Sequence, residues 1–573
     1  MKNILKVSMV LAVAALSFSS CNCFKKMAKN QDEVVLACNP DVLVLNNGKV
    51  GADIQVTFPA KYFNKKAELR VTPVIVFEGG EVAAPTKCLQ GEKVKENYTA
   101  VGKDGGRYTH HVEFAYDDRM QQCELQLRVE VKCPKGGCKE FTLINANNGA
   151  LPTKEEAAVL AAGGAEAQAL MRQFGRTIAK GVNALQKEID FAEAMQPVAN
   201  NYKNVTTVVT KADVAYSINS SKVCKKAVET DALSALKAKV AEHKSNDRAK
   251  QTVYVNGYAS PDGPEKFNDK LSSARSESGK KAVEELLAEA GIQIDAASYG
   301  EDWEGFKEAV ASSSIADKDL ILQVLGMYDS SAQREKEIKN MSTVYKSLKT
   351  EVLPQLRRAQ VVNSADITGK TDDEMVALVN GGNAAALDLE ELLHIAEARP
   401  EVAVAALEAA VKYNDARVYN NLGLAYAKAG ENAKALAAFE NAVKAGGNSA
   451  ELNNNLALAN LANGNVEKAK EYAKAGNAEV QALVNAAEGN YAQASSKLEG
   501  YNAAIAQVMN GDLAAAKKSL ANDNSAKADY LRAVIAAKEG NVNNAKTQLN
   551  SAISKDASLA AKAKKDINLA SLF

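Results

Sequence analysis

Five glycine-containing turns recur through the last third of the chain, and each separates two alanine-rich runs with helical spacing. A repeated pair of short helices cannot bury its apolar face alone, so neighbouring pairs must stack to share a core. The recurrence therefore predicts an array of helix pairs over residues 372–573 rather than one globular bundle. The turns lie at Gly430, Gly464, Gly489, Gly511 and Gly540.

One stretch of this region carries a more specific pattern of aromatic and small residues. It runs Tyr419, Leu422-Gly423, Tyr426, Ala435, Phe439, Ala442. This pattern resembles the tetratricopeptide repeat, whose period of about 34 residues predicts a second unit through Leu456-Ala457, Ala469 and Ala473. Small residues let the two helices of a unit cross closely, while aromatic rings fill the space between them. The resemblance implies an all-α solenoid that recruits a protein partner.

Four asparagines fall on these predicted helices, namely Asn420, Asn421, Asn454 and Asn455. In the family that the pattern resembles, peptides usually bind in a concave groove. The four amides would line or border that groove, which makes them candidate protein-binding residues. The alternative is that they are only solvated, and the sequence leaves both interpretations open.

A second motif lies in the middle of the chain, after the alternating run Thr252–Asn256. It comprises Gly257-Tyr-Ala-Ser-Pro-Asp-Gly263, Asn268, Leu271-Ser272 and Ala274-Arg275. A strand, a Gly/Pro turn and a helix start are the context in which such a motif acts. The order resembles the OmpA-like domain, a periplasmic module that binds peptidoglycan. The resemblance implies a central α+β domain over residues 204–364, with a helical insertion at 302–353.

The resemblance also implies a ligand site for diaminopimelate, in which an Arg and an Asp hold the carboxylate and the ammonium. Arg275 matches the Arg, whereas Ser260 occupies the Asp position. A guanidinium binds a carboxylate in a bidentate manner, and a helix N-terminus favours an anion. Asp262 could replace the missing charge if the turn is rearranged. The candidate peptidoglycan-binding residues are Ser260, Asp262, Asn268 and Arg275. The alternative is a structural Arg275 in a domain that contacts proteins.

The segment 34–147 shows the alternation of short strands separated by turn residues, as in Asp53–Phe58 and Glu124–Lys132. This pattern predicts an all-β, immunoglobulin-like sandwich. Residues 148–203 are alanine-rich with helical spacing, broken at Gly163-Gly164, and predict a helical connector without recognisable chemistry.

Cys133 and Cys138 lie close enough in sequence to close a hairpin-like loop. A C-x4-C pair is compatible with a disulfide or with half of a metal site. No second pair or suitably spaced His accompanies it in the sequence, so the disulfide is favoured and no metal is expected.

Residues 1–20 have a basic start, an apolar core and small residues before Cys21, which is the pattern of a secretory signal peptide. The ending resembles a lipoprotein signal, in which Cys21 becomes the acylated first residue. Cys23 is a poorer alternative, and an ordinary cleaved signal is the other interpretation. Basic residues follow, whereas surface lipoproteins of the Bacteroidetes type usually carry an acidic run. We therefore expect a lipid-anchored protein on the periplasm-facing side of the outer membrane.

The charge balances at 70 basic and 70 acidic residues, without a basic stripe, which argues against nucleic acid as a partner. Catalytic motifs such as G-x-S-x-G, H-E-x-x-H or a Walker loop do not occur in the sequence. We expect no enzyme activity and no cofactor.

These observations predict an envelope scaffold that binds the membrane by its lipid, peptidoglycan by its central domain and an unidentified envelope protein by its repeats. Several weak attachments would then raise each other's effective concentration. The alternative is an assembly or secretion-apparatus factor without peptidoglycan binding. A third option, carbohydrate binding by the sandwich, lacks a stacked aromatic platform in the sequence.

Overall fold

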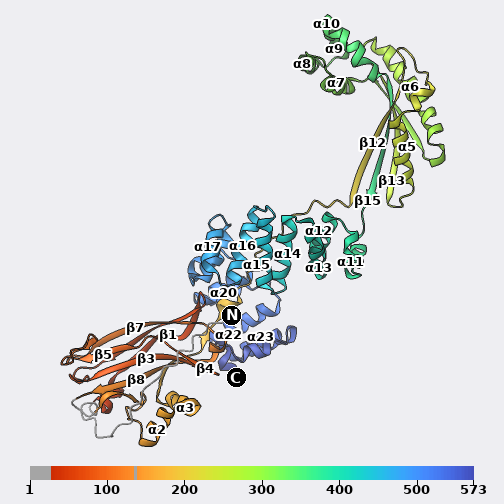
Figure 1. The fold of residues 1–573 in the computed structure, drawn as a ribbon. Coiled ribbons are helices and arrows are strands. Elements are labelled where there is room, and N and C mark those ends of the chain that lie inside the picture. The colour runs from red at the N-terminus through yellow and green to blue at the C-terminus, as the bar shows by residue number, and fades with distance from the viewer. Residues whose placement is uncertain (1–26, 135–137) are drawn as a thin grey trace. The chain divides into compact units, whose positions relative to one another are not determined.

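The structure is a computed structural model that describes residues 27–134 and 138–573 (Figure 1). The chain divides into two compact units, and the second is inserted into the first. The first unit combines the chain up to Ala199 with Ala403–Phe573, and the second is Asn200–Val402. The predicted signal 1–20 and the candidate lipidation residue Cys21 lie outside the described residues. Among those residues, none of the helices has the length and apolarity needed to cross a bilayer.

Two sheets make up the N-terminal part of the first unit. One has the strand order β11-β1-β2-β7 and the other β10-β8-β3-β5-β6, with β4 beside β3 and β9 beside β8; β10 is Arg176–Lys180 and β11 is Val182–Asn183. Apolar residues from both sheets, including Leu43, Val50, Ile75 and Leu125, form one buried cluster. The strands are β1 (Val35–Asn46), β2 (Lys49–Phe58), β3 (Glu68–Phe77), β4 (Gly80–Ala83), β5 (Lys87–Gly91), β6 (Thr99–Val101), β7 (Gly106–Ala115), β8 (Glu124–Cys133) and β9 (Cys138–Ile144). The predicted β-rich region is therefore present, and its sheets include the parallel pairs β1/β11 and β5/β6.

The helical connector predicted over 148–203 is wrong in its second half. Helices α2 (Lys154–Ala162) and α3 (Gly164–Phe174) form, and Gly163 separates them with a φ of 72°. The chain then enters strands β10 (Arg176–Lys180) and β11 (Val182–Asn183), which complete the two sheets. These strands are too short for their alternation to stand out beside the alanine-rich helices. Beyond β11 and the 3-10 turn η3 (Leu185–Glu188) the chain is irregular up to Ala199.

The second unit contains a four-stranded sheet with the order β12-β15-β13-β14. Its strands are β12 (Val205–Ala215), β13 (Ala249–Ala259), β14 (Ile294–Glu301) and β15 (Arg358–Thr368). Helices α5 (Asp231–Lys244) and α6 (Glu265–Leu286) pack on the sheet around Val240, Val253 and Val283. All strands and helices expected around the central motif are thus present.

Between β14 and β15 the chain forms a second small core, as the expected insertion requires. This core contains Trp303, Phe306 and Leu348. The insertion helices are α7 (Trp303–Ser312), α8 (Lys318–Met327), α9 (Ser331–Asn340) and α10 (Ser342–Glu351). After β15 come α11 (Asp372–Asn380) and α12 (Leu389–Ala398), which group with the second unit.

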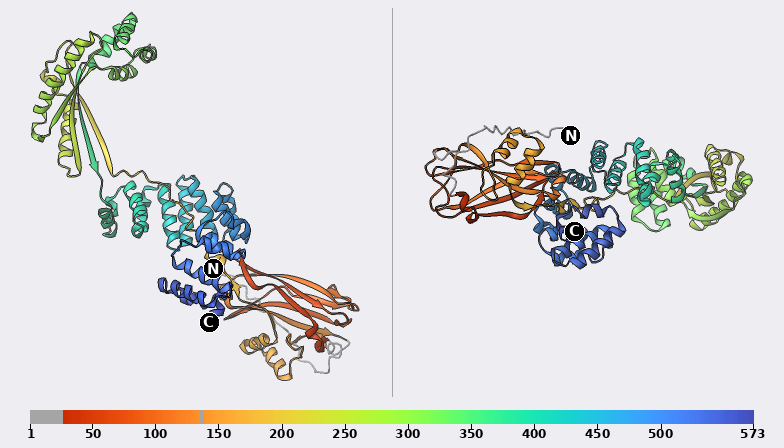
Figure 2. Two further views of the ribbon diagram at one scale, coloured as in Figure 1. Left: turned by 180° about the vertical axis from the view of Figure 1, so that it is seen from behind. Right: turned by 90° about the horizontal axis from the view of Figure 1, so that it is seen from below.

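The C-terminal part of the first unit is a series of helix pairs (Figures 1 and 2). Gly423 lies where the first pair crosses: a Cβ there would be 2.7 Å from the ring of buried Phe439. The predicted turn glycines adopt positive φ, between 76° and 86°. Helix α13 (Ala403–Ala410) precedes the pairs, which are α14 (Ala416–Lys428) with α15 (Asn432–Lys444), α16 (Ala450–Ala462) with α17 (Val466–Ala473), α18 (Ala478–Ala487) with α19 (Tyr491–Ser495), α20 (Gly500–Met509) with α21 (Leu513–Ser519), and α22 (Ala526–Lys538) with α23 (Val542–Lys555).

Candidate functional site

An irregular stretch of the chain's own N-terminal half lies against the helical array. This stretch, Leu185–Val198, is called the bound segment below. Its residues Leu185, Ile189, Ala194 and Met195 are buried in the same apolar cluster as the array helices. Most of its polar contacts with the array are with the first helix of each pair: α14, α16, α18, α20 and α22. We call the side of the array formed by these helices the asparagine face.

Three asparagines hold the bound segment by its main chain. Asn421 on α14 accepts the N–H of Val198 at 2.8 Å and donates to its C=O at 3.0 Å. Asn455 on α16 makes the same pair of bonds with Gln196, at 3.0 and 2.7 Å. Asn502 on α20 makes it with Asp190, at 2.8 and 2.9 Å. Each carboxamide thus satisfies both polar groups of one residue, and we call this arrangement a fork.

The four asparagines predicted from the sequence have different roles. Asn420 donates to Gln196 C=O at 3.4 Å and accepts from Asn455 at 3.0 Å, so it supports the fork at Asn455. Asn454 was a candidate for the same surface, but its Oδ1 accepts the N–H of Asn477 at 3.3 Å. Asn454 thus fixes the start of α18 and makes no hydrogen bond to the bound segment. Adjacent residues of a helix point about 100° apart, which separates Asn454 from Asn455.

Ion pairs add to the forks in the first half of the bound segment. Lys527 on α22 contacts Asp190 at 2.7 Å and Glu193 at 3.0 Å. Burial lowers the pKa of Lys527, but hydrogen bonds to these two carboxylates outweigh burial, so the pKa is raised above its ordinary value. Lys562 pairs with Glu188. These charges belong to the segment's side chains, unlike the forks, which contact only the main chain.

The start of the bound segment is fixed at further points. Gln186 donates to the carbonyls of Ala486 and Ala487 at 2.9 Å each, at the end of α18. It also accepts the N–H of Asn47 at 3.0 Å, in the turn between β1 and β2. This end of the segment therefore joins the sheets to the array.

The forks define what the asparagine face can recognise. Because the forks contact only N–H and C=O groups, they can hold a main chain whatever its side chains are. Sequence reasoning missed Asn502, Lys527 and the bound segment itself. The one available signal was that Asn421 and Asn455 are one repeat period apart.

The second candidate site, in the inserted unit, is closed around Arg275. Arg275 is fully buried, and its Nε, Nη1 and Nη2 donate to the carbonyls of Ser220, Tyr258 and Ser217 at 3.0, 2.9 and 3.2 Å. Burial lowers the pKa of Arg275 to about 10, so it is still protonated at neutral pH. The guanidinium therefore stabilises the chain between β12 and α5 together with β13.

The other predicted residues of this site are engaged in hydrogen bonds within the protein. Ser260 donates to Asp262 at 2.6 Å, and Arg357 contacts Asp262 at 3.5 Å. Asn268 is buried and donates to Glu301 and to the carbonyls of Ser260 and Gly263 at 2.8–3.2 Å. The four residues do come together around one turn. Their polar groups bond mainly to that turn and its neighbours.

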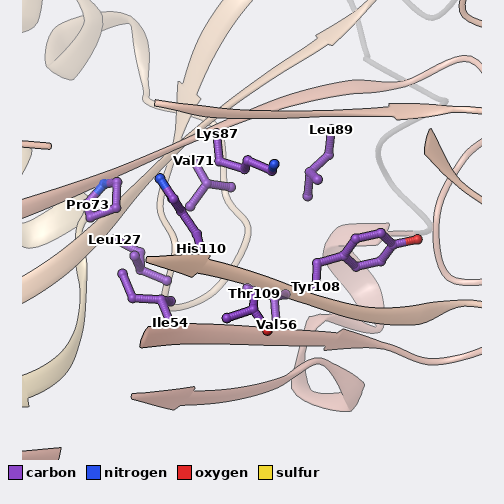
Figure 3. Close-up of a pocket in the computed structure, with 10 residues that line it drawn as sticks. All are labelled: Ile54, Val56, Val71, Pro73, Lys87, Leu89, Tyr108, Thr109, His110 and Leu127. Carbon is purple, nitrogen blue, oxygen red and sulfur yellow. The ribbon is translucent and has the colours of Figure 1, made fainter. Parts of the chain in front are cut away.

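Two hollows lie in the part of the first unit built from the N-terminal sheets. A cavity of about 20 Å³ between the sheets has room for about one water. Figure 3 shows His110 and Lys87 among the residues that line it. Burial is the first cause that lowers the pKa of His110. A larger hollow of about 250 Å³ is bordered by the exposed Lys61, Lys65 and Lys103.

The predicted cysteine pair occupies facing positions on β8 and β9. Cys133 is disulfide-bonded, and the backbone of Cys138 lies directly opposite it in the ladder. Within residues 27–134 and 138–573, no group of three or more His, Cys, Asp or Glu side chains could hold a metal ion.

Comparisons with known proteins identify the array. The family model of the tetratricopeptide repeat matches residues 392–450 and 420–482. A crystal structure described as "YrrB: a TPR protein with an unusual peptide-binding site" is 20 % identical, and the match covers 34 % of this chain and 100 % of that chain, with a TM-score of 0.18. A search of curated proteins gives no match. The chain therefore contains tetratricopeptide repeats, which indicate a role in protein–protein interaction.

Proposed function

We propose that this protein is a non-catalytic scaffold of the bacterial envelope, lipid-anchored through Cys21, that recruits a protein partner through its repeats. The observation that carries this proposal is the row of forks on the asparagine face. Asn421, Asn455 and Asn502 hold the main chain of residues that belong to no helix or strand, and an unfolded segment of a partner presents the same free N–H and C=O groups.

Of the two forms considered from the sequence, the geometry favours the one without peptidoglycan binding. A ligand carboxylate needs a guanidinium with N–H groups that reach the solvent. Arg275 has no exposed surface, and all three of its nitrogens already donate to carbonyls. Asp262, the replacement for the missing Asp, is paired with Arg357 and Ser260. The OmpA-like unit then serves protein contacts or spacing.

The test of peptidoglycan binding is co-sedimentation of the full mature chain with purified sacculi. The expected result is that the wild type stays in the supernatant. Sedimentation that free diaminopimelate abolishes, and that Asp262→Ala weakens while Lys211→Ala on β12 does not, would reinstate the peptidoglycan tether.

Recruitment and anchoring need separate measurements. A photocrosslinking residue in place of Lys428, which is exposed on α14 two helical turns beyond Asn421 and on the same side of that helix, should give a defined protein adduct in the cells of origin. The matched position Lys444, on a second helix, should not. Labelling with palmitate should require Cys21 and persist in Cys23→Ser. A crosslink pattern equal at both positions would contradict recruitment at the asparagine face, and palmitate labelling retained in Cys21→Ser would contradict the anchor.

A further inference from the structure

The surface that would recruit a partner is already occupied by the chain itself. The bound segment uses all three forks, so a second extended segment finds no free carboxamide among them. A partner must therefore either bind elsewhere or displace part of the bound segment. The two halves of that segment differ in how firmly they are held.

The first half, Leu185–Glu193, is held by side chains as well as by its main chain. Asp190 and Glu188 form ion pairs with Lys527 and Lys562. Gln186 bonds to two carbonyls of α18 and to the β1–β2 turn. These contacts connect the sheets, the array and the C-terminal helices, so this half is part of the structural core.

The second half, Ala194–Val198, is called the arm below; its polar contacts with the array involve only its backbone, and its apolar contacts come from Ala194 and Met195. Its hydrogen bonds to the array are the forks at Asn421 and Asn455 and the additional bond from Asn420. Ala194 and Met195 are buried, whereas Gln196 and Pro197 are exposed. Nothing in its recognition by the forks depends on which side chains the arm carries.

We propose that the arm is an internal competitor that closes the α14–α16 part of the asparagine face until an extended segment of a partner protein displaces it. This inference rests on the proposed function and adds the regulation of that site. The fitting partner segment has a small residue and then a large apolar residue, where the arm has Ala194 and Met195. It then has free N–H groups on alternate residues, where the arm has Gln196 and Val198. The residue between them can be proline, because no fork uses its N–H.

Competition within one chain weakens every external ligand, because the tethered arm acts at a high effective concentration. Opening the arm removes this competition, and the affinity for an external segment then rises by the factor by which the open state becomes more populated. A peptide with the arm's own sequence is a sufficient probe, because the forks already bind this sequence in the folded protein.

The experiment uses a fluorescent peptide spanning residues 192–200 and the full mature chain, with fluorescence anisotropy as the readout. Gln196→Pro removes the N–H that Asn455 accepts and so opens the arm. Gln196→Ala keeps that N–H and is the matched control. The expected result is at least tenfold tighter binding by Gln196→Pro than by wild type or Gln196→Ala. Adding Asn455→Ala to Gln196→Pro should abolish the gain.

Equal binding by Gln196→Pro and Gln196→Ala would overturn the proposal, and so would binding that does not depend on Asn455. Met195→Glu is a second way to open the arm and should give the same gain. Amide exchange in α14 and α16 must stay at the wild-type level, which shows that the variants are folded. Because the probe is the chain's own sequence, a negative result refutes the gating and leaves recruitment to be judged by crosslinking.

Discussion

The forks on the asparagine face predict that Asn455→Ala frees the arm. Asn455 is fully buried and makes three hydrogen bonds, two to Gln196 and one to Asn420. A neutral hydrogen bond contributes about 0.5–1.5 kcal/mol, so the two bonds to Gln196 stabilise the closed arm by roughly 1–3 kcal/mol. At about 1.4 kcal/mol per factor of ten, local opening should become about 5- to 150-fold more frequent.

The assay is native-state amide exchange of Val198, whose own fork at Asn421 is untouched by the substitution. Faster exchange there reports opening of the whole arm, and the amide of Asp190, held by Asn502, is the internal reference that should not change. Asn454→Ala is the control, since Asn454 is equally on α16 but bonds only to Asn477. If Val198 exchanges within threefold of wild type in Asn455→Ala, the forks do not act together and the reasoning fails.

Three further predictions concern packing, the buried arginine and the thiols. Gly423→Ala should lower the stability of the first unit by about 1–3 kcal/mol in urea unfolding, because the added Cβ would meet the buried Phe439 ring. The control Gly326→Ala on α8 has open space around its Cβ and should stabilise the second unit by about 0.5–1 kcal/mol. Equal effects of the two substitutions would contradict this packing. Arg275→Lys should destabilise the second unit by about 2–4 kcal/mol, because one ammonium cannot reach three separate carbonyls, and an unchanged unfolding midpoint would contradict the structural role. Burial, and then two nearby aspartates, raise the pKa of Cys38 to about 11, so only about 0.1 % of its thiol is ionised at pH 8 and its alkylation should accelerate as the pH rises towards 11. The exposed Cys224 should therefore be alkylated first at pH 8. The reverse order, measured by mass spectrometry, would contradict the structure.

The helical array could be predicted from the sequence because its determinants are local and repeated. Gly423 and Phe439 meet within one helix pair, and the spacing of such residues repeats along the chain. The elements around the central motif were also expected, since Thr252–Asn256 alternates and the Gly/Pro turn precedes a helical run. The short strands β10 and β11 were missed because a strand of few residues has little periodicity.

The sequence could not predict that Arg275 is buried or that the asparagine face is occupied, because both depend on contacts between distant parts of the chain. Arg275 matches its motif, but two of the three carbonyls that accept its hydrogen bonds, those of Ser217 and Ser220, lie outside any recognisable pattern. The occupation of Asn455 depends on Gln196, which is 259 residues away. An irregular segment bound by its main chain has no apolar period or composition that would reveal it.

The insertion of the second unit has a consequence for the order in which the chain folds. The bound segment is synthesised before the whole inserted unit, and the helices that cover it come afterwards. Its fork at Asn502 spans 312 residues. Until those helices have emerged, Ile189 and Met195 have no partner surface in the array, and the N-terminal sheets cannot complete their docking. Each doubling of the loop length adds only about 0.6 kcal/mol to the entropic cost of closing the loop. The long separation therefore delays the contact during synthesis and has little effect on the stability of the folded protein. During synthesis the growing chain therefore exposes the apolar side chains of Ile189 and Met195 until its last third is complete.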